Sequence, residues 1–150
     1  MKKICLFSIL IMTLFLTGCN GKKLACQHSA TDSFQGTEIT GHKFIYNDKG
    51  NLTDVVINYK TIYNQKYIDT YAVNMDEMIA EIESVCTELK DIKNTTCTAK
   101  LDGTTLYMNI KYNVAKMSNE DLNNLGLTEI IATKYDDMKK EYQNMGFTCQ

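Results

Sequence analysis

The sequence predicts an α+β fold in which an antiparallel β-sheet packs against two main helices, in the order β-β-β-α-β-β-α. Segments 75–90 and 134–145 repeat apolar residues at helical spacing. Segments 37–46, 51–63 and 95–112 have the composition of strands and are bounded by turn residues. Four cysteines in the same part of the chain allow two disulfides that staple these elements together.

The first strands are expected over 37–46 and 51–63, with the turn "NDKG" between them. Between Val55 and Lys60 apolar and polar residues alternate, which is typical of a strand with one buried face. A further strand is expected over 66–73. The chain should therefore begin with a run of antiparallel strands before its first helix.

The segment 75–90 is expected to be an amphipathic helix. Asn74, with Glu77 three residues later, resembles a capping box, which satisfies the free N–H groups of a first turn. One face carries the apolar side chains Met75, Met78, Ile79, Ile82, Cys86 and Leu89. Cys86 is therefore predicted to face the core.

The segment 95–112 is expected to be a β-hairpin that turns at Asp102-Gly103, a pair typical of a two-residue type I′ turn. In that register Leu101 faces Thr104, Ala99 faces Leu106 and Cys97 faces Met108. The predicted apolar face consists of Cys97, Ala99, Leu101, Leu106, Met108 and Ile110. Cys97 should thus also point to the core.

The C-terminal part is expected to be helical. Ser118 and Asp121 predict a short helical turn that ends near Gly126. Thr133 and Asp136 resemble a cap in front of a helix over 134–145, which Gly146 should end. The apolar stripe of that helix is Tyr135, Met138, Tyr142 and Met145.

The first 18 residues have the features of an export signal. Lys2 and Lys3 precede an almost wholly apolar run from Ile4 to Leu16, followed by small residues. The run is about 13 residues long, whereas a membrane-spanning helix needs about 20. An uncleaved membrane anchor is the alternative interpretation.

The stretch Leu16-Thr17-Gly18-Cys19 resembles the lipobox of bacterial lipoproteins. The resemblance implies that Cys19 is alkylated with diacylglycerol and that a peptidase cuts before it. Acyl chains such as palmitate would then hold the mature protein on the cell membrane, outside the cytoplasm. Residues 19–24 would form the lipidated cysteine and a short tether, and residues 25–150 a single domain.

The charge balance argues against nucleic-acid binding. Removal of residues 1–18 takes away two lysines and no acidic residues. The remaining chain has 14 lysines against 18 acidic residues, and the whole sequence contains no arginine. No arginine fork or basic cluster in the sequence could read phosphates or bases.

The remaining cysteines are expected to form two disulfides, as is common in exported domains. Cys86 and Cys97 both face the predicted core and lie 11 residues apart, which favours a bridge between them. Cys26 would then join Cys149. Four reduced, buried cysteines are the alternative, and the spacing does not fit a zinc site.

The early "LACQ" and the closing "GFTCQ", on a small domain behind a lipobox, resemble the YehR-like lipoproteins. This family is functionally uncharacterised. The resemblance implies an α+β fold and a membrane-anchored location, and it supplies no active site.

No pattern in the sequence predicts an enzyme. Hydrolase motifs with a nucleophilic serine or a metal-binding His-Glu pair are absent. His28 and His42 are interpreted as surface histidines near strand ends. The neighbouring acids Asp76-Glu77 and Asp136-Asp137 are interpreted as first-turn residues that complement a helix dipole. We expect no catalytic residues, no metal site and no cofactor.

One pattern favours binding. Tyr59, Tyr63, Tyr67 and Tyr71 share parity and are expected to lie along one face of the sheet, where tyrosines suit protein or glycan partners. A half-buried rim of the core is the alternative. The first hypothesis is a non-catalytic module that binds an envelope protein or glycan. The second is a lipoprotein that binds a small molecule or metal, for example as a transporter accessory.

Overall fold

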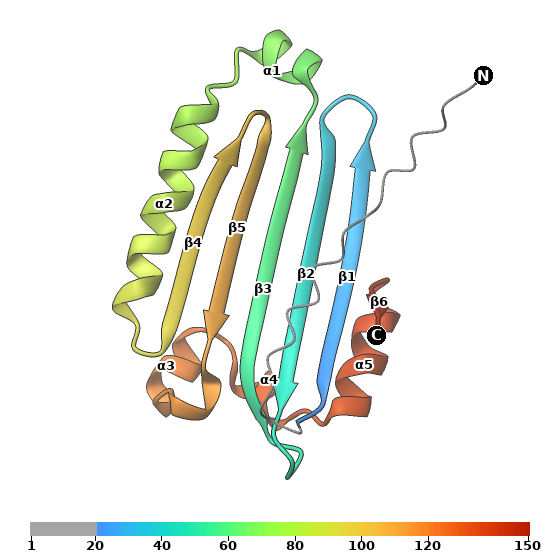
Figure 1. Cartoon of the computed structure of the whole chain (residues 1–150), viewed down its shortest axis with the longest axis vertical. Coiled ribbons are helices and arrows are strands. Elements are labelled where there is room, and N and C mark those ends of the chain that lie inside the picture. The colour runs from blue at the N-terminus through green and yellow to red at the C-terminus, as the bar shows by residue number, and fades with distance from the viewer. Residues whose placement is uncertain (1–20) are drawn as a thin grey trace, which may run out of the picture.

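The computed structural model describes residues 21–150, so the predicted leader and Cys19 lie outside the described residues. The fold is α+β, with a six-stranded antiparallel sheet in the order β4-β5-β3-β2-β1-β6 (Figure 1). Its strands are β1 Lys23–Asp32, β2 Gly36–Tyr46, β3 Leu52–Tyr63, β4 Thr95–Asp102, β5 Thr105–Tyr112 and β6 Thr148–Cys149. Its helices are α1 Gln65–Tyr71, α2 Met75–Asp91, α3 Asn119–Asn124, α4 Thr128–Ala132 and α5 Tyr135–Asn144, with a 3₁₀ turn at Val114–Lys116.

The sheet begins earlier in the chain than predicted. Lys23 and Leu24, expected in the tether of residues 19–24, belong to β1, which pairs with β2 from Lys23↔Ile45 to Asp32↔Gly36. Leu24 is completely buried. Apart from Leu24 and Cys26, β1 is mostly polar or small, so its sequence does not show the alternation that marks the other strands.

The predicted strand over 66–73 is wrong, because this segment forms the helix α1. Tyr67 and Tyr71 are four residues apart, a spacing that fits one face of a helix as well as one face of a strand. The helix ends at Ala72, which has φ 48°, and the Val73 N–H donates to the Ile68 carbonyl.

The hairpin of β4 and β5 forms with a different register. Leu101 pairs with Leu106, Ala99 with Met108 and Cys97 with Ile110, and the turn residues are Gly103 and Thr104. The register differs from the predicted one by two residues. Because side chains alternate with a period of two, this shift leaves the predicted apolar face unchanged.

Both predicted disulfides, Cys26–Cys149 and Cys86–Cys97, are present. The second fastens α2 to β4. The first links β1 to β6, the short strand that follows α5. Directly opposed residues of a sheet point to the same face, and one such row across all six strands consists of Cys97, Ile110, Ile57, His42, Cys26 and Cys149. α2 is therefore bonded to this face of the sheet, and α5 packs on the same face, where its Tyr142 hydrogen-bonds His42 of that row.

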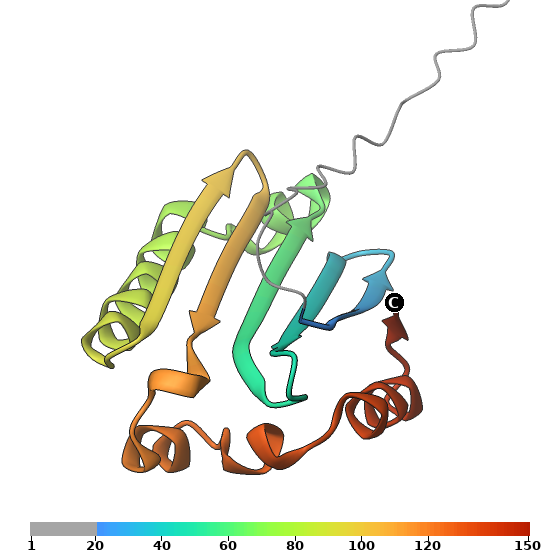
Figure 2. The same cartoon turned by 60° about the horizontal axis from the view of Figure 1, so that its bottom comes forward.

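The core fills this face between the sheet and the helices. Its fully buried side chains include Leu24, Phe44, Tyr46, Val55 and Met138. Figure 2 shows α3, α4 and α5 as a series of short helices that runs across one end of the sheet, from the β5 side to the β1 side.

The helical predictions are confirmed for α2, α3 and α5, with local differences. Asn74 caps α2 by accepting from the N–H groups of Asp76 and Glu77, and the Ser118 hydroxyl caps α3. The predicted cap at Thr133 is wrong, because Thr133 ends α4, a helix that the sequence did not predict, and its hydroxyl donates back to the Glu129 carbonyl in the first turn of that helix. Met145 is 54% exposed, outside the buried stripe.

Candidate functional site

Three of the four predicted tyrosines gather at one end of the sheet. Tyr63 ends β3, and Tyr67 and Tyr71 lie on α1. The Tyr63 and Tyr67 rings stack with centroids 6.0 Å apart, and the Tyr67 and Tyr71 rings are 5.1 Å apart. Phe34, in the turn between β1 and β2, lies edge-on to Tyr67 at 5.7 Å and to Tyr71 at 5.9 Å. We call Phe34, Tyr63, Tyr67 and Tyr71 the aromatic tip.

Polar contacts hold the two halves of the aromatic tip together. The Asn64 side-chain amide, just before α1, donates to the carbonyls of Ser33 and Phe34 at 3.0 and 3.1 Å. The Asp32 carboxylate accepts from the N–H groups of Gln35 at 2.6 Å and Phe34 at 2.8 Å, which lowers the pKa of Asp32. The turn that carries Phe34 is thus fixed against the start of α1.

A glycine allows this close approach. Gly36 starts β2 with φ 138°, and a Cβ at this position would lie 2.0 Å from the Ile62 carbonyl oxygen. Any larger residue would push β2 away from β3 just below the Phe34 turn. The backbone of the tip therefore depends on a residue without a side chain.

The aromatic tip is open to solvent at its outer end. Tyr71 is 64% exposed, and the other three rings are half-buried. The Lys66 ammonium lies 6.0 Å from the centroid of Phe34. Burial, and then the charge of Glu38, raises the pKa of Tyr63, so its hydroxyl stays protonated at neutral pH. The tip offers ring faces and hydroxyl groups together, which suits protein contacts.

Tyr59 does not belong to this cluster. It lies four residues before Tyr63 on β3, where it pairs with Thr40 and Met108. Its side chain is on the helix-bearing face and is 40% exposed. It borders an open hollow of about 280 Å³ that Ile82 of α2 and Leu106 of β5 also line. The prediction of one tyrosine face is therefore corrected: α1 bends the chain away from the sheet after Tyr63.

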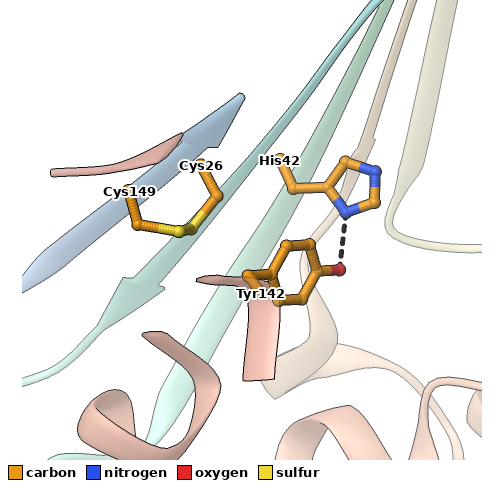
Figure 3. The surroundings of a disulfide bond; sticks show 4 residues. All are labelled: Cys26, His42, Tyr142 and Cys149. Carbon is orange, nitrogen blue, oxygen red and sulfur yellow. Dashed lines mark hydrogen bonds between the residues drawn. A yellow bond between two sulfur atoms is a disulfide. The ribbon is translucent and has the colours of Figure 1, made fainter. Parts of the chain in front are cut away.

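His42 and Tyr142 form a second polar group, inside the fold. The His42 Nδ1 and the Tyr142 hydroxyl oxygen are 2.6 Å apart, beside the Cys26–Cys149 disulfide (Figure 3). Tyr142 packs against Phe44 at 5.1 Å and Phe147 at 5.0 Å between ring centroids. The prediction that His42 is a surface residue near a strand end is wrong, since it lies within β2 under α5. Its alternation with Phe44 and Tyr46 was the signal for this position.

The chemistry of this pair is that of a satisfied core hydrogen bond. Burial lowers the pKa of His42 and raises the pKa of Tyr142 to about 12. A tyrosine with that pKa stays protonated, and no hydrogen bond joins His42 to a carboxylate within residues 21–150. His28 lies nearby with its ring 5.4 Å from Phe147. The arrangement provides neither an activated nucleophile nor a general base oriented by a third group.

The other predicted groups lie apart from both clusters. Asp76 and Glu77 lie in the first turn of α2, and Asp136 and Asp137 in the first turn of α5, as predicted. Within residues 21–150, no three His, Cys, Asp or Glu side chains come together as a metal site. In the same part of the chain, no helix has the length and apolar character of a membrane span.

Comparison with known proteins supports the fold. No family model and no curated protein matches the chain. An NMR structure of a protein from Streptococcus pneumoniae TIGR4 is similar, with a TM-score of 0.59 and 16% sequence identity. The similarity covers 100% of this chain and 97% of that one. At this identity the likeness shows a shared fold and nothing about activity.

Proposed function

We propose that this chain is a lipoprotein, acylated at Cys19 and held on the outer side of the cell membrane, that binds an envelope protein through its aromatic tip without catalysis. The observation that carries the binding role is the cluster of Phe34, Tyr63, Tyr67 and Tyr71, with Tyr71 64% exposed. Monomeric domains rarely expose grouped aromatic rings without using them.

The direction of β1 supports an anchored arrangement. β1 runs for ten residues, from Lys23 to Asp32, and ends beside the turn that carries Phe34. At about 3.3 Å per residue, a strand of this length separates its ends by roughly 30 Å. An anchor at Cys19 would therefore leave the aromatic tip at the far end of the sheet, where a partner can reach it. Two disulfides are also typical of proteins outside the cytoplasm.

Replacing the predicted acylation site tests the anchor. We expect Cys19→Ser to abolish labelling by an alkyne fatty acid and to leave the leader attached, because only a thiol forms the thioether. Labelling followed by mass spectrometry of the N-terminus measures both effects. Cys5→Ser makes the same change at the other cysteine of the predicted leader, serves as the matched control and should keep its label. Normal acylation of Cys19→Ser would contradict the proposal.

Removing the exposed rings tests the binding role. We expect Tyr67→Ala/Tyr71→Ala to lower recovery of a crosslinked protein partner from intact membranes at least tenfold, because the tip loses its largest apolar surface. Tyr59→Ala removes a ring that is 40% exposed outside the tip and should leave recovery unchanged. Circular dichroism checks that all variants are folded. The binding role is overturned if the natural sequence captures no partner above background, or if Tyr59→Ala loses as much.

A further inference from the structure

The sheet has a second face that carries no helix among residues 21–150. α2 is bonded to Cys97 and α5 hydrogen-bonds His42 in the same row, so neighbouring residues along each strand point the other way. No helix is drawn across the strands on the side of the sheet that faces the viewer in Figure 1. We call this surface the open face. Asn58 in its middle is exposed, whereas Ile57 beside it packs against the core.

Three neighbouring rows of side chains cross the middle of the open face. The first contains Lys43 and Lys111, separated by Val56. The third contains Lys60 and Lys100, on either side of Tyr107. Between these rows lie uncharged hydrogen-bonding groups, which are Gln27, Asn58, Asn109 and Thr98. Two rows of cations therefore flank a strip of amides and a hydroxyl.

Positive charge is concentrated on this face of an acidic domain. Residues 21–150 hold 14 lysines and 18 acidic residues. In addition to the four lysines of the rows, the open face carries Lys23, which is paired with Ile45 at the start of β1. Against these five lysines it has two acids, Asp54 and Asp102. The rest of the domain consequently has nine lysines against sixteen acids.

Two of the four lysines in the rows, like Lys23 outside them, have no acidic partner within residues 21–150 and can meet an external anion. Lys111 is paired with Asp54 at 3.2 Å and Lys100 with Asp102 at 3.0 Å. Within residues 21–150, Lys43 and Lys60 have no carboxylate within ion-pair distance. The Lys60 ammonium lies 5.5 Å from the centroid of Tyr107, a contact that positions the cation and leaves its charge in place.

A hollow lies next to Lys43. Gly41 has no side chain to fill the middle row. The gap that it leaves is surrounded by Gln27, Ser29, Lys43, Asn58 and Thr148. Its volume is about 650 Å³ and it is open to solvent. The Asn58 oxygen accepts a hydrogen bond from the Asn109 amide, so the two amides are held in one orientation. The hollow thus offers several donors and acceptors at fixed positions beside a cation.

We propose that the open face binds an anionic glycan, with Lys43 and Lys60 contacting its acidic groups and the row of Gln27, Asn58 and Asn109 bonding its hydroxyls. An anionic glycan carries both acidic groups and hydroxyls. The acidic groups complement the lysine rows, and the hydroxyls complement the amides between them. An acidic peptide could also pair with the lysines and the amides, but it lacks the repeating hydroxyl groups of a glycan, so it is tested as a competing ligand. This surface is separate from the aromatic tip, so the inference stands apart from the proposed function.

Charge reversal on the open face tests the proposal. Hyaluronan oligosaccharides serve as the carboxylated probe and dextran as the uncharged one, with binding measured by titration calorimetry at low salt. We expect hyaluronan and not dextran to bind, and Lys43→Glu/Lys60→Glu to weaken binding at least tenfold. The matched control Lys116→Glu/Lys140→Glu makes the same change in net charge elsewhere and should keep most of the affinity. Thermal melts establish that both variants are folded.

A second readout separates glycan binding from simple charge attraction. In NMR titrations with hyaluronan, the side-chain amide signals of Gln27, Asn58 and Asn109 should shift. Polyglutamate and vesicles of anionic phospholipid are tested in the same way. The proposal is overturned if hyaluronan does not bind, if both double variants lose affinity equally, if the amide signals do not move with hyaluronan, or if polyglutamate or the vesicles bind as tightly as hyaluronan.

Discussion

Replacing Cys26 and Cys149 together by alanine is expected to lower the free energy of unfolding by about 5 kcal/mol, since the bridge closes a very long loop. The two cysteines are 123 residues apart in sequence. Without the bridge, β6 is held to β1 by a short ladder that includes two hydrogen bonds of 2.9 Å between Ala25 and Gln150. We therefore also expect α5 to detach more readily from His42 and Phe44. Urea unfolding of the non-reduced protein measures the loss.

The other disulfide provides the control. Cys86–Cys97 spans only 11 residues, so its replacement by alanines should cost about 3 kcal/mol by the same loop-entropy relation. The order of the two losses is the test. A larger loss for the short loop would mean that local packing of α2 on β4, and not loop closure, determines what the bridges contribute.

Phe44→Ala is expected to lower the free energy of unfolding by about 3 to 5 kcal/mol, as is usual when a large buried aromatic ring is removed. Phe44 is completely buried, and its ring centroid lies 5.1 Å from that of Tyr142 and 6.3 Å from that of His42. The cavity would lie under α5, where the His42–Tyr142 hydrogen bond holds the helix to the sheet. Thermal and urea unfolding measure the change.

Phe34→Ala removes the same side chain from the aromatic tip, where the ring is half-buried. Its cost in stability should be less than half that of Phe44→Ala, because solvent can occupy the space that the ring leaves. Equal losses for the two variants would show that the tip is a part of the cooperative core and not a surface available to a partner.

The sequence was informative where local signals agreed with one another. α2 combines helical spacing with a cap at Asn74, and its position is as predicted. The face of the β4–β5 hairpin was predictable even with the wrong register, because a two-residue shift preserves which side chains point inward. The pairing of Cys86 with Cys97 followed from these two faces.

The failures lie where long-range contacts decide the structure. β1 has a weak pattern and is a strand because β2 and β6 pair with it along both edges. Around Tyr67, the spacing of four fits a strand or a helix, and the hydrogen bonds of Asn64 to the Phe34 turn favour the helix. Phe34 has no periodic neighbours of its own, so only the folded structure brings it to the tip.

The pairing of β1 with β2 also has a mechanical consequence. In the proposed arrangement the membrane pulls at the start of β1 and a partner pulls at Tyr67 and Tyr71, which follow the end of β3. Ten residue pairs join β1 to β2, and β2 pairs in turn with β3, with hydrogen bonds perpendicular to the strands. A force between the start of β1 and the end of β3 would load these ladders in shear, so that their bonds resist together instead of opening one after another. After the first three residues of β1, the covalent Cys26–Cys149 link also passes part of the tension to β6, near the C-terminus.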